Sequence, residues 1–166
     1  MVQWIFWSLL LVSSATSSQP PPAVPPGYSR IDGAKNPEQI PEYVLWQTVF
    51  ENLKTVPPEW LRTQLTVPRT EETRLFAEAK AYAERQAACA ERMDRMTANT
   101  PPKDQDRLFR EITLACRQAD LDAADALLAE FSPETRQKVA DWVDSKRRTI
   151  VLMVDKHHAD IFRLPR

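Results

Sequence analysis

The sequence predicts an all-α protein: an antiparallel bundle of four to five helices that follows a signal peptide and a proline-rich spacer. Three observations support this fold class. The chain has only two glycines, Gly27 and Gly33, so the turn residues that connected strands need are missing after the spacer. Prolines stand where helices are expected to begin. Apolar residues recur at alternating spacings of three and four along the rest of the chain.

Residues 1–18 have the pattern of a signal peptide. Trp4 to Val12 form an apolar run as long as an h-region, roughly 7–15 residues, and the small residues after it offer cleavage after Ala15, Ser17 or Ser18. The run is shorter than the ~20 apolar residues that cross a bilayer, so no stable membrane span is expected after cleavage. A buried N-terminal helix is the alternative, since no Lys or Arg precedes the run. We expect an exported protein, periplasmic or secreted.

Residues 19–35 are expected to form a flexible proline-rich spacer. Ser18 to Gly27 contains five prolines, each of which fixes φ and cannot donate a backbone hydrogen bond. The helical domain is then expected over residues 36–166. Its first helix lies in KNPEQIPEYVLWQTVFENLK, with Asn36 as N-cap and Pro37 or Pro41 in the first turn. One face of this helix carries Tyr43, Trp46, Phe50 and Leu53.

A proline-broken connector with one short turn around residues 59–64 leads to the second helix, which is expected to start near Thr70. Its inward positions alternate in steps of four and three, as in the seam of an antiparallel bundle. They are Leu75, Ala79, Tyr82, Gln86, Cys89, Met93 and Met96. The segment NTPPKD, residues 99–104, ends this helix and starts the next, and a further short helix follows, after a kink at Asp120 as one option.

The last helix has the strongest start signal. Ser132 is placed as N-cap, Pro133 at the first helical position and Glu134 beside the positive end of the dipole. The spacing of inward residues then predicts a helix from Pro133 nearly to Phe162. Those residues are Val139, Val143, Lys146, Ile150, Met153, His157 and Ile161.

The two cysteines are expected to form a disulfide. Cys89 lies ~13.5 Å before the turn at residues 99–104 and Cys116 ~18 Å after it, at 1.5 Å per helical residue. The mismatch is less than one helical turn, and both sulfurs fall on core-facing stripes. Two such thiols usually pair in an oxidising compartment. The alternative is two buried free thiols.

No metal site and no cofactor are expected. The residues that offer soft or imidazole ligands are weak candidates only: Met93, Met96, Met153 and His157. Such ligands suit Cu(I). These residues also continue the apolar stripes, however, and methionine commonly fills gaps in cores. Consecutive helical residues point ~100° apart, so His157 and His158 are not expected to bind one ion together.

Charge and motifs exclude several function classes. With 22 basic and 23 acidic residues and no one-signed block, the chain lacks the basic face of a nucleic-acid binder. It has no glycine-rich phosphate loop, no Gly-x-Ser-x-Gly turn and no well-placed Cys–His pair. Neighbouring carboxylates such as Asp122 and Asp125, or Glu71 and Glu72, are interpreted as solvated or capping residues. We expect no catalytic residues and no enzyme.

Two segments resemble known groups of exported proteins. IDGAKNPEQIPEYVLWQTVFENL, residues 31–53 of the 166, resembles an opening segment of uncharacterised exported bacterial helical proteins and implies no activity. The likeness is carried by Asp32, Gly33, Asn36, Pro37, Glu38, Ile40 and Pro41. FSPETRQK, residues 131–138, is similar to the Leu-Thr-x-x-Gln element of periplasmic stress chaperones and metal-resistance sensors. Thr135 stands at its glutamine position, as does Arg69 in a second copy, LTVPR.

These observations together predict a non-enzymatic, exported bacterial module that binds an unknown protein or peptide partner. An aromatic patch that includes Trp46, Trp60 and Trp142 is the expected binding surface. The alternative is a periplasmic stress chaperone or a metal-sensing, metal-resistance protein.

Overall fold

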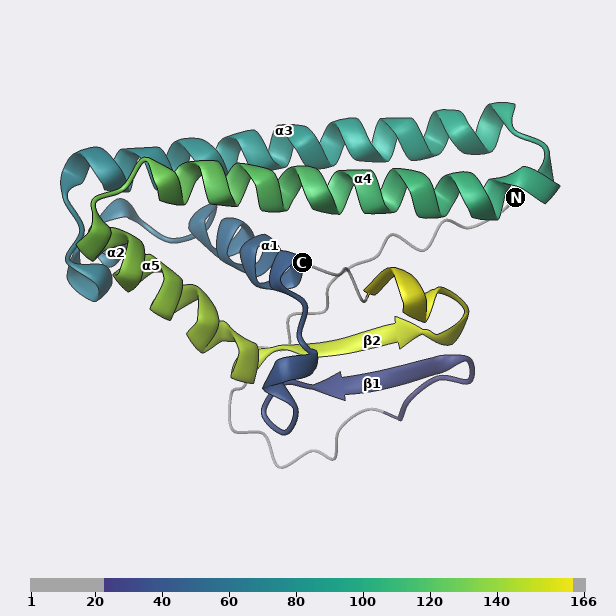
Figure 1. Ribbon diagram of the computed structural model, residues 1–166, viewed down its shortest axis with the longest axis horizontal. Coiled ribbons are helices and arrows are strands. Elements are labelled where there is room, and N and C mark those ends of the chain that lie inside the picture. The colour runs from purple at the N-terminus through teal and green to yellow at the C-terminus, as the bar shows by residue number, and fades with distance from the viewer. Residues whose placement is uncertain (1–22, 163–166) are drawn as a thin grey trace.

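The computed structural model describes residues 23–162. The expected signal peptide, with its cleavage sites at Ala15, Ser17 and Ser18, lies outside the described residues. So do the first residues of the expected spacer. The described chain is mostly helical, as the sequence predicts, but it also contains a small two-stranded antiparallel sheet that was not predicted (Figure 1).

The long helices α3 and α4 form an antiparallel hairpin, and the shorter helices and the sheet lie on one side of it (Figure 1). Helix α1 packs against α3, α4 and α5. In chain order the elements are β1 (Tyr28–Asp32), the 3-10 helix η1 (Pro37–Gln39), α1 (Glu42–Leu53), α2 (Pro58–Leu65), α3 (Arg69–Asn99), α4 (Pro102–Ala129), α5 (Pro133–Ser145), the 3-10 helix η2 (Lys146–Thr149), β2 (Val151–Asp155) and the 3-10 helix η3 (Lys156–Phe162).

Proline sets most of the helix starts. It occupies the first turn of α2, α4 and α5, where its missing N–H would lack a helical partner in any case. The predicted cap of α5 is confirmed, because the backbone amide of Thr135 donates to Ser132 Oγ over 3.3 Å. The expected first helix is divided instead: Asn36 precedes only η1, and α1 begins after Pro41. Helix α4 runs through Asp120 as one helix, since no proline or glycine interrupts it.

The core is organised around α1, and the inward stripe predicted for α3 is correct only as far as Tyr82. Leu75, Ala79 and Tyr82 are buried, whereas none of residues 83–111 is. Helix α1 has 12 residues and α3 has 31, so α1 covers only part of the hairpin. The predicted core positions Gln86, Cys89, Met93 and Met96 are therefore only partly buried. We call residues 86–116 the hairpin arm; it extends well past the end of α1 in Figure 1.

The predicted disulfide is present in the structure. Cys89 of α3 and Cys116 of α4 are bonded to each other, with their Cα atoms 6.2 Å apart. Both cysteines are partly buried and lie where the hairpin leaves the core. The bond thus joins the two helices where α1 no longer holds them together.

The last helix ends at Ser145, so the prediction that it continues nearly to Phe162 is wrong. The chain turns through η2 and enters β2, where burial alternates residue by residue. Leu152 and Val154 are buried, whereas Val151 and Met153 are 38% and 36% exposed. This period of two marks a strand with one face on the core. Ile150 and Ile161 are buried as expected, but from an extended segment and a 3-10 helix.

Strand β1 lies within residues 19–35, which were expected to be a flexible spacer. It pairs with β2 from Tyr28 opposite Asp155 to Asp32 opposite Val151, so the folded part of the chain includes at least residue 28 onward. Gly33 follows the strand, and its amide donates to Ile150 O over 2.9 Å. A Cβ at Gly33 would lie 1.9 Å from the carbonyl oxygen of Arg147, so only glycine fits there.

Two arginines of α4 attach the C-terminal segment to the hairpin. The Arg117 guanidinium lies between the rings of Tyr43 and Phe162, 4.4 and 4.7 Å from their centroids, and donates to Ile161 O. Arg110 pairs with Asp160 and donates to the carbonyl oxygen of His157 over 2.9 Å. These contacts place η3 against the arm, a position that a continuous last helix would not reach.

Replacing both cysteines, Cys89→Ser with Cys116→Ser, should lower the free energy of unfolding by roughly 3–4 kcal/mol, because the unfolded chain regains the freedom of the closed loop. Urea unfolding of the oxidised wild type and the variant measures this difference. Reduced wild type should match the variant. An unchanged midpoint would contradict a bond that links the helices of the arm.

Candidate functional site

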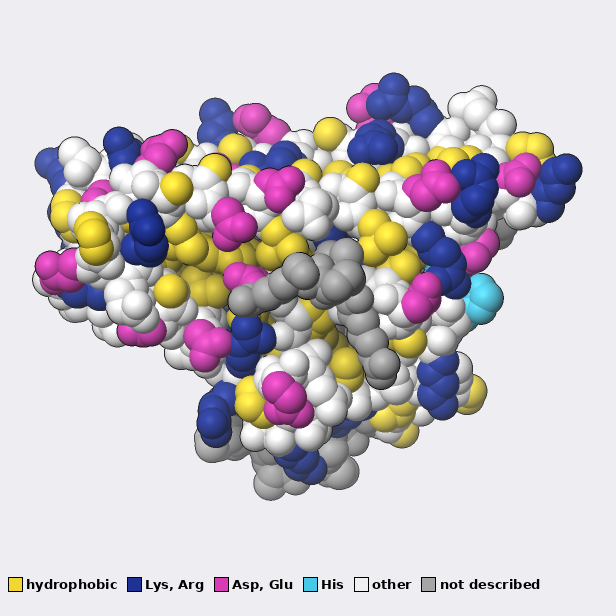
Figure 2. Space-filling model, in the orientation of Figure 1, with side chains coloured by type: hydrophobic (Ala, Val, Ile, Leu, Met, Phe, Trp, Pro, Cys, Tyr) yellow, Lys and Arg dark blue, Asp and Glu magenta, His cyan; other side chains and the backbone are white. Residues whose placement is uncertain are grey.

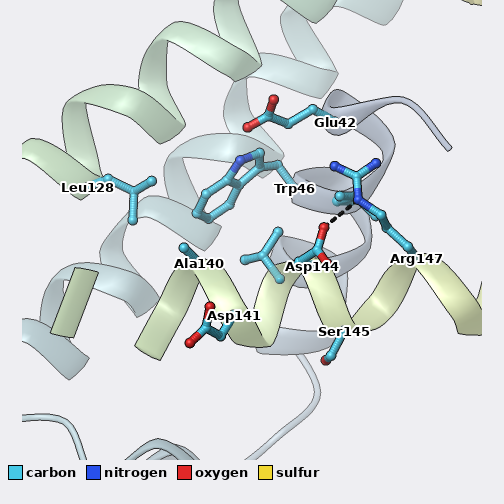
Figure 3. Close-up of a pocket in the computed structure, with 10 residues that line it drawn as sticks. Glu42, Trp46, Leu128, Ala140, Asp141, Asp144, Ser145 and Arg147 are labelled. Atoms are coloured by element: carbon cyan, nitrogen blue, oxygen red, sulfur yellow. Dashed lines mark hydrogen bonds and ion pairs between the residues drawn. The ribbon is translucent and has the colours of Figure 1, made fainter. Parts of the chain in front are cut away.

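A groove between α1, α4 and α5 is the candidate functional site. Hydrophobic side chains gather in a hollow below α4 and beside α5 in Figure 2, and Figure 3 shows the residues around it. The groove encloses about 520 Å³, within the range of 300–1,000 Å³ usual for ligand sites. Its lining residues are Glu42, Leu45, Trp46, Leu128, Ala140, Asp141, Val143, Asp144, Ser145 and Arg147.

The floor of the groove is apolar and belongs to the core. Leu45, Trp46 and Val143 are at most 4% exposed. The Trp46 indole stacks on Phe50 with ring centroids 5.5 Å apart, which holds it in place. Leu128 of α4 and Ala140 of α5 stand partly buried at the sides. The floor is thus a rigid apolar surface, formed before any ligand binds.

The rim is charged, with three carboxylates and one guanidinium. Asp144 forms an ion pair with Arg147, whose guanidinium also donates to Ile40 O and so holds the rim to the start of α1. Asp141 accepts a hydrogen bond of 2.7 Å from the side chain of Gln137. Glu42 is the third carboxylate. Acidic residues thus outnumber basic ones in the lining, a composition that favours ligands with a cationic group.

The three tryptophans do not form the single aromatic patch that was expected. Trp46 is 2% exposed and faces the groove from below. Trp60 of α2 and Trp142 of α5 form a separate, partly buried pair with ring centroids 5.9 Å apart. Lys146 Nζ lies 5.3 Å from the centre of the Trp142 ring. Each tryptophan therefore serves first as a packing residue.

Helices α1, α3 and α4 share a polar cluster around Asp120, which is 1% exposed. Its carboxylate accepts hydrogen bonds from Gln47 Nε2 at 3.4 Å, Arg85 Nε at 3.2 Å and Gln86 Nε2 at 2.9 Å. Arg85 also pairs with Glu78 at 2.7 Å. Burial raises the pKa of the Asp120 carboxyl, and these donors offset that effect only in part. The cluster fixes the mutual position of three helices.

The carboxylates at the start of α3 are structural too. Glu71 accepts a 2.9 Å hydrogen bond from the backbone amide of Ser132 and so caps α5 from outside. Burial raises the pKa of Glu71, but the hydrogen bonds from Ser132 and Thr135 outweigh it and leave that pKa lowered. Glu72 pairs with Arg62 of α2 at 2.8 Å. Both acids tie neighbouring elements to α3. Glu71 is a cap, as expected, but both side chains are buried, so the expectation that they are solvated is wrong.

The weak metal candidates are distributed over three elements. Met93 and Met96 are partly buried on α3, Met153 is 36% exposed on β2, and Cys89 is occupied by its disulfide. His157 lies on η3 and is brought beside His158, with ring centroids 4.7 Å apart.

The expectation that the two imidazoles point apart is wrong, because it assumed a regular helix through both residues, whereas the backbone of His158 is not helical. The segment is a 3-10 helix kinked at His158. Sequence reasoning missed the third member of this cluster, Asp106 of α4, since nothing in the sequence pairs residue 106 with residues 157–158.

No protein-family model, curated protein or solved structure matches this chain. The resemblance of residues 31–53 to exported helical proteins, and that of residues 131–138 to Leu-Thr-x-x-Gln proteins, therefore stay predictions. Among residues 23–162, no helix has the combination of length and apolarity that a membrane span requires.

The raised pKa of Asp120 predicts a specific pH dependence of stability. The folded state binds the Asp120 proton more tightly than the unfolded state, whose pKa is near 3.8. As the pH rises from 3.8 through the folded-state pKa, the wild type should therefore lose stability relative to an Asp120→Asn variant.

Urea unfolding of both proteins at several pH values between about 3.5 and 7 measures this difference. Asp125→Asn, an exposed position on the same helix, is the control. A difference that grows in favour of the wild type with rising pH would mean that the ionised form of Asp120 is the stabilised one.

Proposed function

We propose that this chain is a non-enzymatic, exported bacterial module that binds a short peptide segment of a partner protein. In this proposal a signal peptide precedes the helical bundle, and the groove between α1, α4 and α5 is the binding site. The observation that supports it best is the combination of a rigid apolar floor with a mainly acidic rim. A peptide with one large apolar side chain next to a lysine or arginine matches both features.

The apolar side chain would supply most of the binding energy. Burying a leucine or phenylalanine against Trp46 and Leu128 contributes roughly 1.5–3 kcal/mol. The rim carboxylates, near the solvent, contribute chiefly to orientation and to the rate of association. A groove of about 520 Å³ holds only a few side chains. A single peptide is therefore expected to bind weakly, because the groove buries only one large apolar side chain.

A binding role fits the chemistry of the polar groups around the groove. The Ser145 hydroxyl donates to Trp142 O over 2.6 Å, and no histidine or cysteine is among the residues that line the groove. Asp141 and Asp144 are each engaged with a neighbouring side chain. These groups are suited to recognising a cation, and none is placed beside a base that would activate it as a nucleophile.

Selection of a displayed random-peptide library on the full-length protein tests the proposal. Selected peptides should share a large apolar residue close to a lysine or arginine. The Ala140→Arg variant places a bulky cation in the groove, and it should weaken their binding at least about tenfold, or 1.4 kcal/mol. Ala126→Arg, at an exposed site on α4 outside the lining, is the matched control.

Two outcomes would refute this role: selection of acidic peptides, or equal binding by the wild type and the Ala140→Arg variant. A periplasmic stress chaperone, the alternative expected from the sequence, would instead suppress aggregation of unfolded clients whichever residue stands at position 140. Circular dichroism of both arginine variants checks that each still folds.

A further inference from the structure

Three potential metal ligands converge where η3 meets the arm. His158 Nε2 lies 3.0 Å and His157 Nε2 lies 3.4 Å from the same carboxylate oxygen, Oδ1 of Asp106. All three ligand atoms lie within 4.8 Å of one another. Asp106 comes from α4 and the histidines from η3, so the cluster joins two elements that are distant in the sequence.

The spacing of these atoms suits a tetrahedral ion. Zinc binds histidine nitrogen and carboxylate oxygen at about 2.0–2.1 Å, which gives a tetrahedron with edges of about 3.3–3.4 Å. The two nitrogen–oxygen distances of 3.0 and 3.4 Å are close to such edges. The third distance, between the two imidazole nitrogens, is at most 4.8 Å, so an ion seated between the three atoms requires the two rings to turn toward it.

Neighbouring groups orient two of the three ligands, as is usual around bound metals. Asp155 Oδ2 lies 3.3 Å from His158 Nδ1, and a carboxylate at that place favours the tautomer with its proton on Nδ1, while Nε2 faces Asp106. Arg110 Nε donates to Asp106 Oδ2 over 2.9 Å, which leaves Oδ1 facing the imidazoles. The Phe109 ring packs on the His158 ring with centroids 4.9 Å apart.

The cluster also brings together the imidazoles of the whole chain. The sequence has two histidines, both here, and two cysteines, both in the disulfide. Around the cluster, the carboxylates of Asp106, Asp155 and Asp160 outnumber the Arg110 guanidinium. That balance favours a divalent cation.

We propose that Asp106, His157 and His158 bind a divalent transition-metal ion of the zinc type. This site lies outside the peptide groove and goes beyond the proposed function. His157 is 70% exposed, so the fourth coordination position faces solvent and is open to water or to a ligand from a partner. The ion bridges α4 and η3, and its binding stabilises the docking of the C-terminal segment on the arm.

Isothermal titration of the full-length protein, purified without a polyhistidine tag, with ZnCl₂ near neutral pH tests the site. One ion should bind per chain and raise the melting temperature, as any ligand specific for the folded state does. His158→Gln, His157→Gln and Asp106→Asn should each weaken binding at least tenfold. Asp155→Asn, which removes only the orienting partner, should weaken it about 10–100-fold. Asp94→Asn, an exposed carboxylate of the arm, should change nothing.

Two results would overturn the site: no heat and no change in melting temperature with ZnCl₂, or wild-type affinity in the His157→Gln, His158→Gln double variant. In that case the same contacts are hydrogen bonds between the imidazoles and the carboxylate. Should a variant fail to fold, the site can be tested on the wild type alone, by following the imidazole NMR signals as Zn²⁺ is added. Zn²⁺ must shift those of both histidines, and unchanged signals refute the proposal. The test of the peptide groove does not depend on these results. Loss of peptide binding by Ala140→Arg would support the groove whether or not Zn²⁺ binds.

Discussion

Burial of α1 is the constraint on which the rest of the structure depends. Eight of its 12 residues are buried, on all sides of the helix, so it needs partners all around it. The α3–α4 hairpin covers one side, and α5 and η2 cover another. All of these partners follow α1 in the chain, which explains why a short helix near the N-terminus determines where the later segments lie.

The mismatch in length between α1 and the hairpin explains two further features. Beyond Tyr82, α3 and α4 have little besides each other and η3 to pack against, so apolar burial alone holds them weakly. At this boundary, a polar cluster and a disulfide hold the two helices together instead of a continuous apolar core. The Asp120 cluster with Arg85 and Gln86 fixes the helix register, and the Cys89–Cys116 bond joins the two helices covalently.

Local chemistry could be predicted from the sequence, whereas pairing between distant segments could not. The Ser132 cap and the start of the α3 stripe follow from residues a few positions apart. The cysteine pair, with a sequence separation of 27, follows from the single turn between two helices. Strand β2 was missed because Ile150 and Met153 continue the helical spacing of Val139 and Val143. Its partner β1 lies across almost the whole chain, so no hairpin turn marks the pair.

The candidate sites were unpredictable for the same physical reason. The groove takes its floor and sides from α1, α4 and α5, and no short sequence motif predicts that these three helices lie side by side. Trp46 could be recognised as a buried aromatic residue but not as the groove floor. For the histidine cluster, the helical period assumed for residues 157–158 gave the wrong ring directions, and Asp106 became a neighbour only through the docking of η3 on α4.

The role of α1 is tested most directly by native-state hydrogen exchange, resolved by residue. Amides in the buried turns of α1, residues 46–53, should exchange most slowly and only through global unfolding, because every element must separate to expose them. Amides of the arm near residues 93–110 should exchange faster, through local opening. Exchange of the α1 amides at the rate of the arm, or ahead of it, would contradict a fold organised around this helix.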